Sequence, residues 1–245
     1  MVKKIVAMSP NNKRRLEVEK QIKEHPGTKA HNLWDNLARA YQSVYRVNRE
    51  HLVKFIAAPG ENDQLSVELM QNQWEPKVKE AYMNELSRLI HNYIASSFTL
   101  VDHTRYLMTH YQESNFHAEY ELKKTKVIDM PEHHFLKDFR NYVLHRNLPP
   151  IDYTVGLRDE VNNTFELRLN TPTLLEWDGW TKKSKEFIKA HKYKLVFVDV
   201  INKHGQVIDE LNVWVLEQFT PLHSKDIADV NELMHLRNNI LSGKA

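Results

Sequence analysis

Cysteine is absent from the 245 residues of this chain, and only six glycines occur. Without thiols the chain can form no disulfide, no thiolate zinc site and no cysteine nucleophile. The scarcity of glycine argues against an all-β fold, and neither G-x-G-x-x-G nor G-x-x-x-x-G-K is present. The chain therefore lacks the sequence features of Rossmann and P-loop nucleotide sites.

Long apolar runs are missing as well. No run approaches the roughly 18 apolar residues of a membrane span, and the apolar run after Lys4 is too short for a signal peptide. We therefore predict a cytoplasmic protein that does not cross a membrane. The residues are 41% hydrophobic and 27% charged, as in a folded globular protein, and the net charge of +2 does not by itself indicate a nucleic-acid binder.

Apolar residues recur at every third or fourth position along most of the chain, a spacing typical of helices with one buried face. The two longest patterns cover 31–58 and 76–111. We expect a mainly α-helical protein with about seven or eight helices, separated at breaks rich in proline and glycine. The other expected helices cover 14–24, 116–127, 131–148, 180–194 and 224–241, with a short helix or an ordered connection over 61–74.

The period changes after Pro149 and Pro150. Apolar side chains alternate on both sides of a polar turn at 158–163, which predicts a β-hairpin around 151–169. Thr171 is expected to cap the helix that follows, with Pro172 in its first turn.

Residues 193–219 carry two conflicting signals. The run from Leu195 to Ile201 has the composition of a strand. Apolar residues nevertheless keep a helical period across the whole segment. Because the period is a stronger signal than intrinsic propensity, we predict a helix.

The segment between Pro131 and Pro149 is predicted to be one helix of about four turns, because proline suits a first helical turn and stops a preceding helix. Asn141 and His145 are four residues apart and are therefore neighbours on its surface. We expect Asp138 on the same exposed side, with Arg140 at the border. The opposite side is apolar and expected to be buried; it carries Phe135, Leu136, Phe139, Tyr142 and Val143.

The run Arg140-Asn141-Tyr142-Val143-Leu144-His145 resembles the R-N-x-x-x-H signature of HEPN domains. These are small helical bundles that include many metal-independent endoribonucleases of prokaryotic defence and toxin systems. The resemblance covers about 28–150, where long helices precede the signature. It implies a HEPN-like helical core over 28–150. The resemblance does not explain the hairpin at 151–170 or the C-terminal helices at 171–245, which we place with this core in a single domain of residues 1–245.

The resemblance also implies a reaction, an endonucleolytic cleavage of RNA. RNA carries its own nucleophile in the 2′-hydroxyl group, so the cleavage needs no metal and no other cofactor. His145 can act as acid or base near neutral pH, and Arg140 offers a permanently charged, forked grip on phosphate. Asn141 is expected to orient the imidazole or the phosphate. HEPN ribonucleases combine two such helices, which implies a homodimer with a composite site, and a toxin setting would add an antitoxin partner.

Two further groups of residues are expected to assist this site. Lysines after Trp180 form the best phosphate-contacting surface, although a solvated helix face is the alternative interpretation. Side chains on the motif helix and on the long helix before it are expected to support the motif, with salt bridging at the edge of the core as the alternative. The lysines are Lys182, Lys183, Lys185 and Lys189, and the supporting residues are Asp102, Arg105, Asp138 and Tyr142.

The arrangement of Arg140, Asn141 and His145 on the motif helix is also compatible with a second function. A non-catalytic HEPN-like protein would use this helix to bind a nucleotide or a partner protein, and any surface helix shows a polar side opposite an apolar one. His103, His110 and His117 are seven residues apart, so about 10 Å separates neighbours along a helix, too far to share one ion. We therefore predict no metal site.

Overall fold

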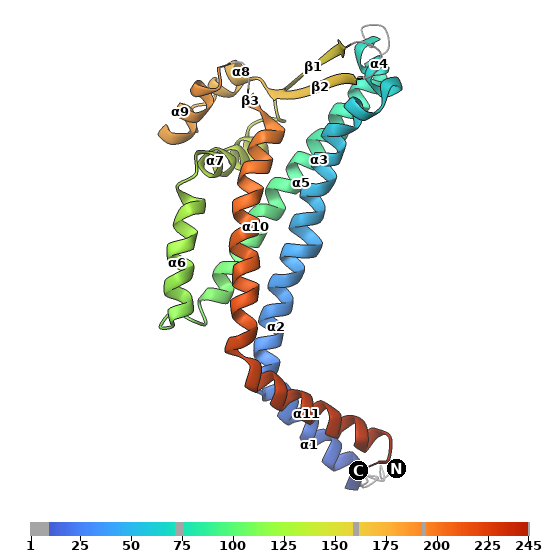
Figure 1. Cartoon of the computed structure of the whole chain (residues 1–245), viewed down its shortest axis with the longest axis vertical. Coiled ribbons are helices and arrows are strands. Elements are labelled where there is room, and N and C mark those ends of the chain that lie inside the picture. Colours follow the sequence, from blue (N-terminus) through green and yellow to red (C-terminus); the bar gives the residue numbers. More distant parts are fainter. Residues whose placement is uncertain (1–9, 72–75, 159–161, 193–194, 245) are drawn as a thin grey trace, which may run out of the picture. The chain divides into compact units, whose positions relative to one another are not determined.

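The computed structural model describes residues 10–71, 76–158, 162–192 and 195–244. The protein is mainly α-helical with a small three-stranded antiparallel sheet (Figure 1). The chain divides into two compact units, one made of residues 39–213 and the other of residues 1–38 together with 214–245. The tip of the predicted hairpin and the end of the predicted basic helix, at 159–161 and 193–194, lie outside the described residues.

The smaller unit contains α1 (Pro10–Glu24), most of α2 (Pro26–Arg39) and α11 (Ser224–Leu241). Helices α1 and α11 pack against each other, and Gly27 approaches the first turn of α11 closely. A Cβ atom at Gly27 would lie 2.1 Å from the carbonyl oxygen of Asp226, so only glycine fits there. The apolar core of this unit contains Val18, Ile22, Val230 and Ile240.

A continuous helical path leads from α2 through the π-helical segment η1 (Ala40–Tyr45) into α3 (Arg46–Glu61). The predicted helix over 31–58 is therefore confirmed, but it does not end before Pro59. Proline removes the N–H that would bond the carbonyl of Phe55. That carbonyl instead accepts a hydrogen bond of 3.3 Å from the Tyr82 hydroxyl, which explains how α3 continues past its proline.

The larger unit continues with α4 (Asp63–Gln71), α5 (Pro76–Met108), α6 (Asn115–Ile128) and α7 (Pro131–His145). Helix α5 runs for 33 residues without a break, three residues short of the predicted end. In this unit α3 and α5 lie side by side, and the part of α10 (Phe197–Leu222) that belongs to it runs along them (Figure 1).

The predicted hairpin is confirmed as β1 (Ile151–Arg158) paired antiparallel with β2 (Asn162–Leu169). A third strand, β3 (Leu195–Val196), pairs with β2 through Leu169 and Leu195. Helix α8 (Thr171–Leu175) comes directly after β2. Its N-terminal cap is Asn170, whose side chain accepts a hydrogen bond from the Thr173 amide. The prediction of Thr171 as cap is wrong, because its hydroxyl donates instead to the carbonyl of Lys192.

Helix α9 (Lys182–Ala190) is shorter than the predicted basic helix and is capped by Thr181. After the two residues of β3, α10 (Phe197–Leu222) is a helix of 26 residues. The helical interpretation of 193–219 is therefore correct from Phe197 onward. The boundary between the two units falls inside α10, after Val213. Among the described residues, no helix is both long and apolar enough to cross a membrane.

Candidate functional site

Helix α7 carries the motif, and its apolar side is buried as predicted except at Val143, which is half-buried. Phe135 and Phe139 are fully buried, and Tyr142 is nearly so. The Tyr142 ring stacks on Trp180 at 5.7 Å and meets Trp177 edge-on. This aromatic packing holds the buried side of α7 against Trp177 and Trp180.

Asp138 does not lie on the exposed side, and the prediction that it joins Asn141 and His145 there is wrong. Its side chain is buried, and its Oδ2 atom accepts hydrogen bonds from the Thr181 backbone amide at 2.8 Å and the Thr181 hydroxyl at 2.6 Å. A buried carboxylate requires such partners. It also places a negative charge beside the N-terminus of α9, where the helix dipole favours it. Asp138 therefore joins α7 to α9.

The three motif residues Arg140, Asn141 and His145 are all exposed. At about 100° per residue they span one continuous arc of α7, which also includes the exposed Leu144. Within the described part of the chain, the side chains of Asn141 and His145 form no hydrogen bond. The arc is therefore available to a ligand or to a second molecule.

A groove of about 180 Å³ between α5 and α7 is lined in part by Arg140, Phe98, Asp102 and His91. The guanidinium of Arg140 lies 5.4 Å from the centre of the Phe98 ring, a cation–π contact. Asn141 and His145 are not part of the lining. The structure thus brings Asp102 to Arg140, but it separates Arg140 from the other two motif residues by the curvature of the helix.

Arg105 is paired with Asp102 at 3.5 Å across one turn of α5, and both side chains are strongly exposed. Exposed pairs of this kind contribute little to stability. Arg105 does not line the groove beside Arg140, so its contact with the motif is indirect and runs through Asp102.

Among the predicted lysines, Lys183 contacts the motif helix. Its ammonium nitrogen is 3.0 Å from Nε2 of His134, in the first turn of α7. Burial first, and then the neighbouring Lys183, lowers the pKa of His134, so a neutral imidazole can accept this hydrogen bond. From His134 to His145 the helix rises by roughly 16 Å. Lys182 and Lys189 are exposed, whereas Lys185 is half-buried.

Two histidines that are not among the predicted site residues form a polar array with Tyr93, in which Tyr93 and His204 are buried and His133 is half-buried. Nδ1 of His204 lies 3.3 Å from the Tyr93 hydroxyl, and Nε2 of the same His204 ring lies 3.2 Å from Nδ1 of His133. Burial is the main reason that the pKa of His204 falls to about 3 and that of His133 to about 4. The sequence carried one signal of this array, since His204 occupies a position of the apolar period of its helix.

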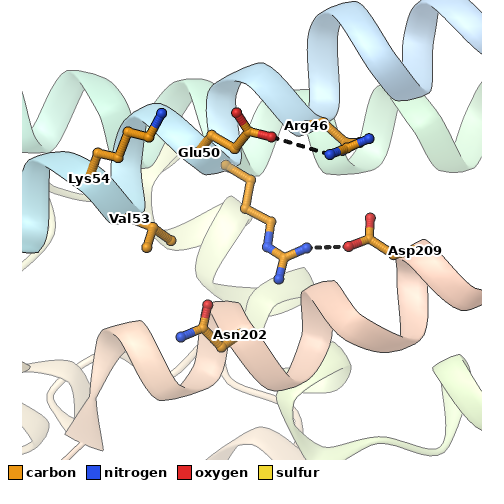
Figure 2. Close-up of a pocket in the computed structure, with 7 residues that line it drawn as sticks. Arg46, Glu50, Val53, Lys54, Asn202 and Asp209 are labelled. Carbon is orange, nitrogen blue, oxygen red and sulfur yellow. Dashed lines mark hydrogen bonds and ion pairs between the residues drawn. The ribbon is translucent and has the colours of Figure 1, made fainter.

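A second polar cluster joins α3 to α10. Arg49 is paired with Asp209, and the Tyr41 hydroxyl donates to the other oxygen of the same carboxylate at 3.1 Å. Burial, followed by the charge of Asp209, raises the pKa of Tyr41 to about 12, so its hydroxyl remains a donor. This cluster borders a pocket of about 290 Å³ (Figure 2). No sequence spacing points to it, because Arg49 and Asp209 are 160 residues apart.

In the described ranges, no group of three His, Asp or Glu side chains is arranged to hold a metal ion. No protein-family model, curated protein or solved structure matches the chain. The functional interpretation therefore rests on the residues and their geometry.

Proposed function

We propose that this protein is a HEPN-like, metal-independent endoribonuclease whose site combines Arg140, Asn141 and His145 from two copies of the chain. The observation that carries the proposal is the exposure of all three side chains on one arc of α7, while the opposite side of the helix is held by buried aromatic rings. Such a packed helix holds the backbone that carries a guanidinium and an imidazole, and this positions both groups for transition-state stabilisation.

The chemistry follows from the residue types. One imidazole takes the proton of the 2′-hydroxyl, whose oxygen attacks the adjacent phosphorus. The bond from phosphorus to the 5′ oxygen breaks, and the second imidazole gives that oxygen a proton. The products are a 2′,3′-cyclic phosphate and a 5′-hydroxyl. Arg140 offsets the negative charge that builds up on the phosphorane oxygens, and Asn141 orients the His145 ring one turn away.

Each chain supplies one His145, so the two proton transfers require a second copy. Apolar side chains beside the motif support such a dimer. Leu144 is 41% exposed in the middle of the arc, and Leu148 is 66% exposed just after the helix. Burying these side chains against a twin helix would stabilise the dimer and bring the two imidazoles toward each other.

The test is cleavage of an RNA labelled at both ends, in the presence of EDTA, by the wild type and by single variants. His145→Ala and Arg140→Ala should each lose at least about a hundredfold in rate. The matched controls are His110→Ala and Arg88→Ala, because both residues are exposed and neither lines the groove beside Arg140. Full activity of His145→Ala, or loss of activity in EDTA, would overturn the proposal.

A second candidate is a non-catalytic protein that binds a nucleotide. The observation that favours it is the groove in which Arg140 and Phe98 lie together without Asn141 and His145, since a phosphate and a base could use these two side chains alone. This function predicts that a mononucleotide binds without turnover. Binding would be lost in Arg140→Ala and Phe98→Ala but kept in His145→Ala.

A further inference from the structure

The pocket between α3 and α10 carries a concentration of charge that the motif helix does not use. Its rim on α3 contains Arg46, Arg49, Glu50 and Lys54, which recur at three to four positions and so share one side of the helix. Figure 2 shows Arg46, Glu50 and Lys54 on α3 across from Asn202 and Asp209 on α10. All of them belong to the larger unit of the chain.

The two carboxylates of this pocket already have partners. Glu50 accepts from Arg46 at 3.4 Å, and Asp209 is bound by Arg49 and by the Tyr41 hydroxyl. Lys54 is exposed at the rim and forms no ion pair with any described residue. The three cations and two carboxylates leave the pocket with an excess of one positive charge, and its guanidinium groups are held by their carboxylates.

Gly205 on α10 provides the space for one of these groups. A Cβ atom at this position would lie 2.3 Å from Cζ of Arg49, so a larger residue would displace the guanidinium from its place beside Asp209. The backbone of α10 therefore packs directly against the Arg49 side chain. This close approach holds the guanidinium at the pocket wall.

We infer that this pocket binds a small phosphate monoester. Guanidinium groups match the oxygens of phosphate in geometry and charge, and an ammonium adds a point charge that can turn toward them. Asn202 can donate to a hydroxyl or to a phosphate oxygen. The volume of about 290 Å³ is at the lower end for ligand pockets, and the described residues of the lining include no aromatic ring on which a base could stack. A phosphorylated sugar fits these features better than a nucleotide does.

The experiment is a calorimetric titration of the full chain with inorganic phosphate and with ribose 5-phosphate, with ribose as the uncharged control. We expect saturable one-site binding of both phosphates and none of ribose. Lys54→Met should weaken binding at least tenfold, because it removes the one cation of the described lining that has no protein partner. Lys77→Met, a change of an exposed lysine outside the pocket, should leave the affinity unchanged.

Gly205→Ala is an independent variant, because its added methyl group moves Arg49 without removing any charge. It should also weaken binding at least tenfold, while circular dichroism verifies that the helices are intact. If Gly205→Ala does not fold, Lys54→Met decides alone. Absence of saturation with both phosphates, or equal affinity of the wild type and Lys54→Met, would overturn the inference, the latter showing an adventitious ion only. An effect of Lys54→Met on the binding of an RNA oligonucleotide but not of either phosphate would overturn it in favour of RNA.

Discussion

The Nε2 atom of His204 on α10 lies 3.2 Å from the Nδ1 atom of His133 on α7, and the two rings stack with their centres 5.4 Å apart. In this geometry one neutral imidazole donates to the other. A proton added to the buried His204 ring or to the half-buried His133 ring would be poorly solvated, and it would repel the other ring. The folded protein therefore keeps both histidines neutral.

This pair predicts a loss of stability in acid. The pKa values in the folded state, about 4 for His133 and about 3 for His204, lie below the unfolded value of about 6.5. Below pH ~6.5 the unfolded chain therefore binds more protons, and stability falls until the pH reaches the folded values. Each histidine contributes a slope of up to about 1.4 kcal/mol per pH unit. Urea unfolding between pH 7.5 and 5 measures the sum.

The variant His204→Gln separates this effect from general acid denaturation. Its amide can still bond with Tyr93 and His133 but does not titrate, so we expect the slope between pH 6.5 and 5 to fall by about half. His110→Gln changes an exposed histidine on the loop after α5 and should leave the slope as it is. An identical slope in His204→Gln and the wild type would show that the buried pair is not responsible.

Asp138 is predicted to contribute more to the free energy of unfolding than an aspartate on an exposed helix side would. Asp138→Ala removes the acceptor of two hydrogen bonds from Thr181 and leaves the N-terminus of α9 without its negative charge. We expect a loss of about 1–3 kcal/mol in the free energy of unfolding. Denaturant unfolding measures it.

Asp102→Ala is the matched control, since this aspartate forms an exposed ion pair within one helix. It should change stability by less than about 1 kcal/mol. Equal losses in the two variants would mean that the Thr181 contacts do not stabilise the junction of α7 and α9.

Gly27 is predicted to be essential for the packing of the smaller unit. Alanine normally improves an α-helix by about 1 kcal/mol over glycine, but here its Cβ would lie 2.1 Å from a backbone oxygen of α11. Backbone cannot swing away as a side chain does, so we expect Gly27→Ala to cost a net of about 1–3 kcal/mol. Faster amide exchange in α1 and α11 would report it, whereas Lys29→Ala, an exposed change two residues later, should leave that exchange unchanged.

The predictions from the sequence succeeded where one local period decided the outcome. The aromatic residues of α7 recur at three to four positions, and Phe135, Phe139 and Tyr142 are buried accordingly. The same rule correctly overrode the strand-like composition after Leu195, because a helix of 26 residues sums many weak preferences. Within the strand-like run from Leu195 to Ile201, only the two residues of β3 form a strand, as their intrinsic propensity favours.

The features that escaped prediction depend on partners far along the chain. Asp138 lies at the edge of the exposed arc. Its side chain is buried because it accepts hydrogen bonds from Thr181, which is 43 residues away. Helix α3 passes Pro59 because Tyr82 supplies a hydrogen bond from another helix. The charged pocket requires residues 160 positions apart to meet. Spacing within one element carries no information about such contacts.

Lys183 is predicted to contribute to the binding of single-stranded RNA, a prediction that depends on the proposed ribonuclease function. It lies against the first turn of α7, so an RNA that reaches His145 can extend along the helix and contact this ammonium group. In a His145→Ala background, which prevents cleavage, Lys183→Gln should weaken the binding of single-stranded RNA and reduce the slope of log affinity against log salt by about 0.7. Fluorescence anisotropy at several salt concentrations measures the slope. Lys77→Gln is the control, because it removes one exposed lysine from α5 with the same change in net charge. A smaller slope in both variants would show that the effect comes from the net charge of the protein. A smaller slope in Lys183→Gln alone would place RNA along α7.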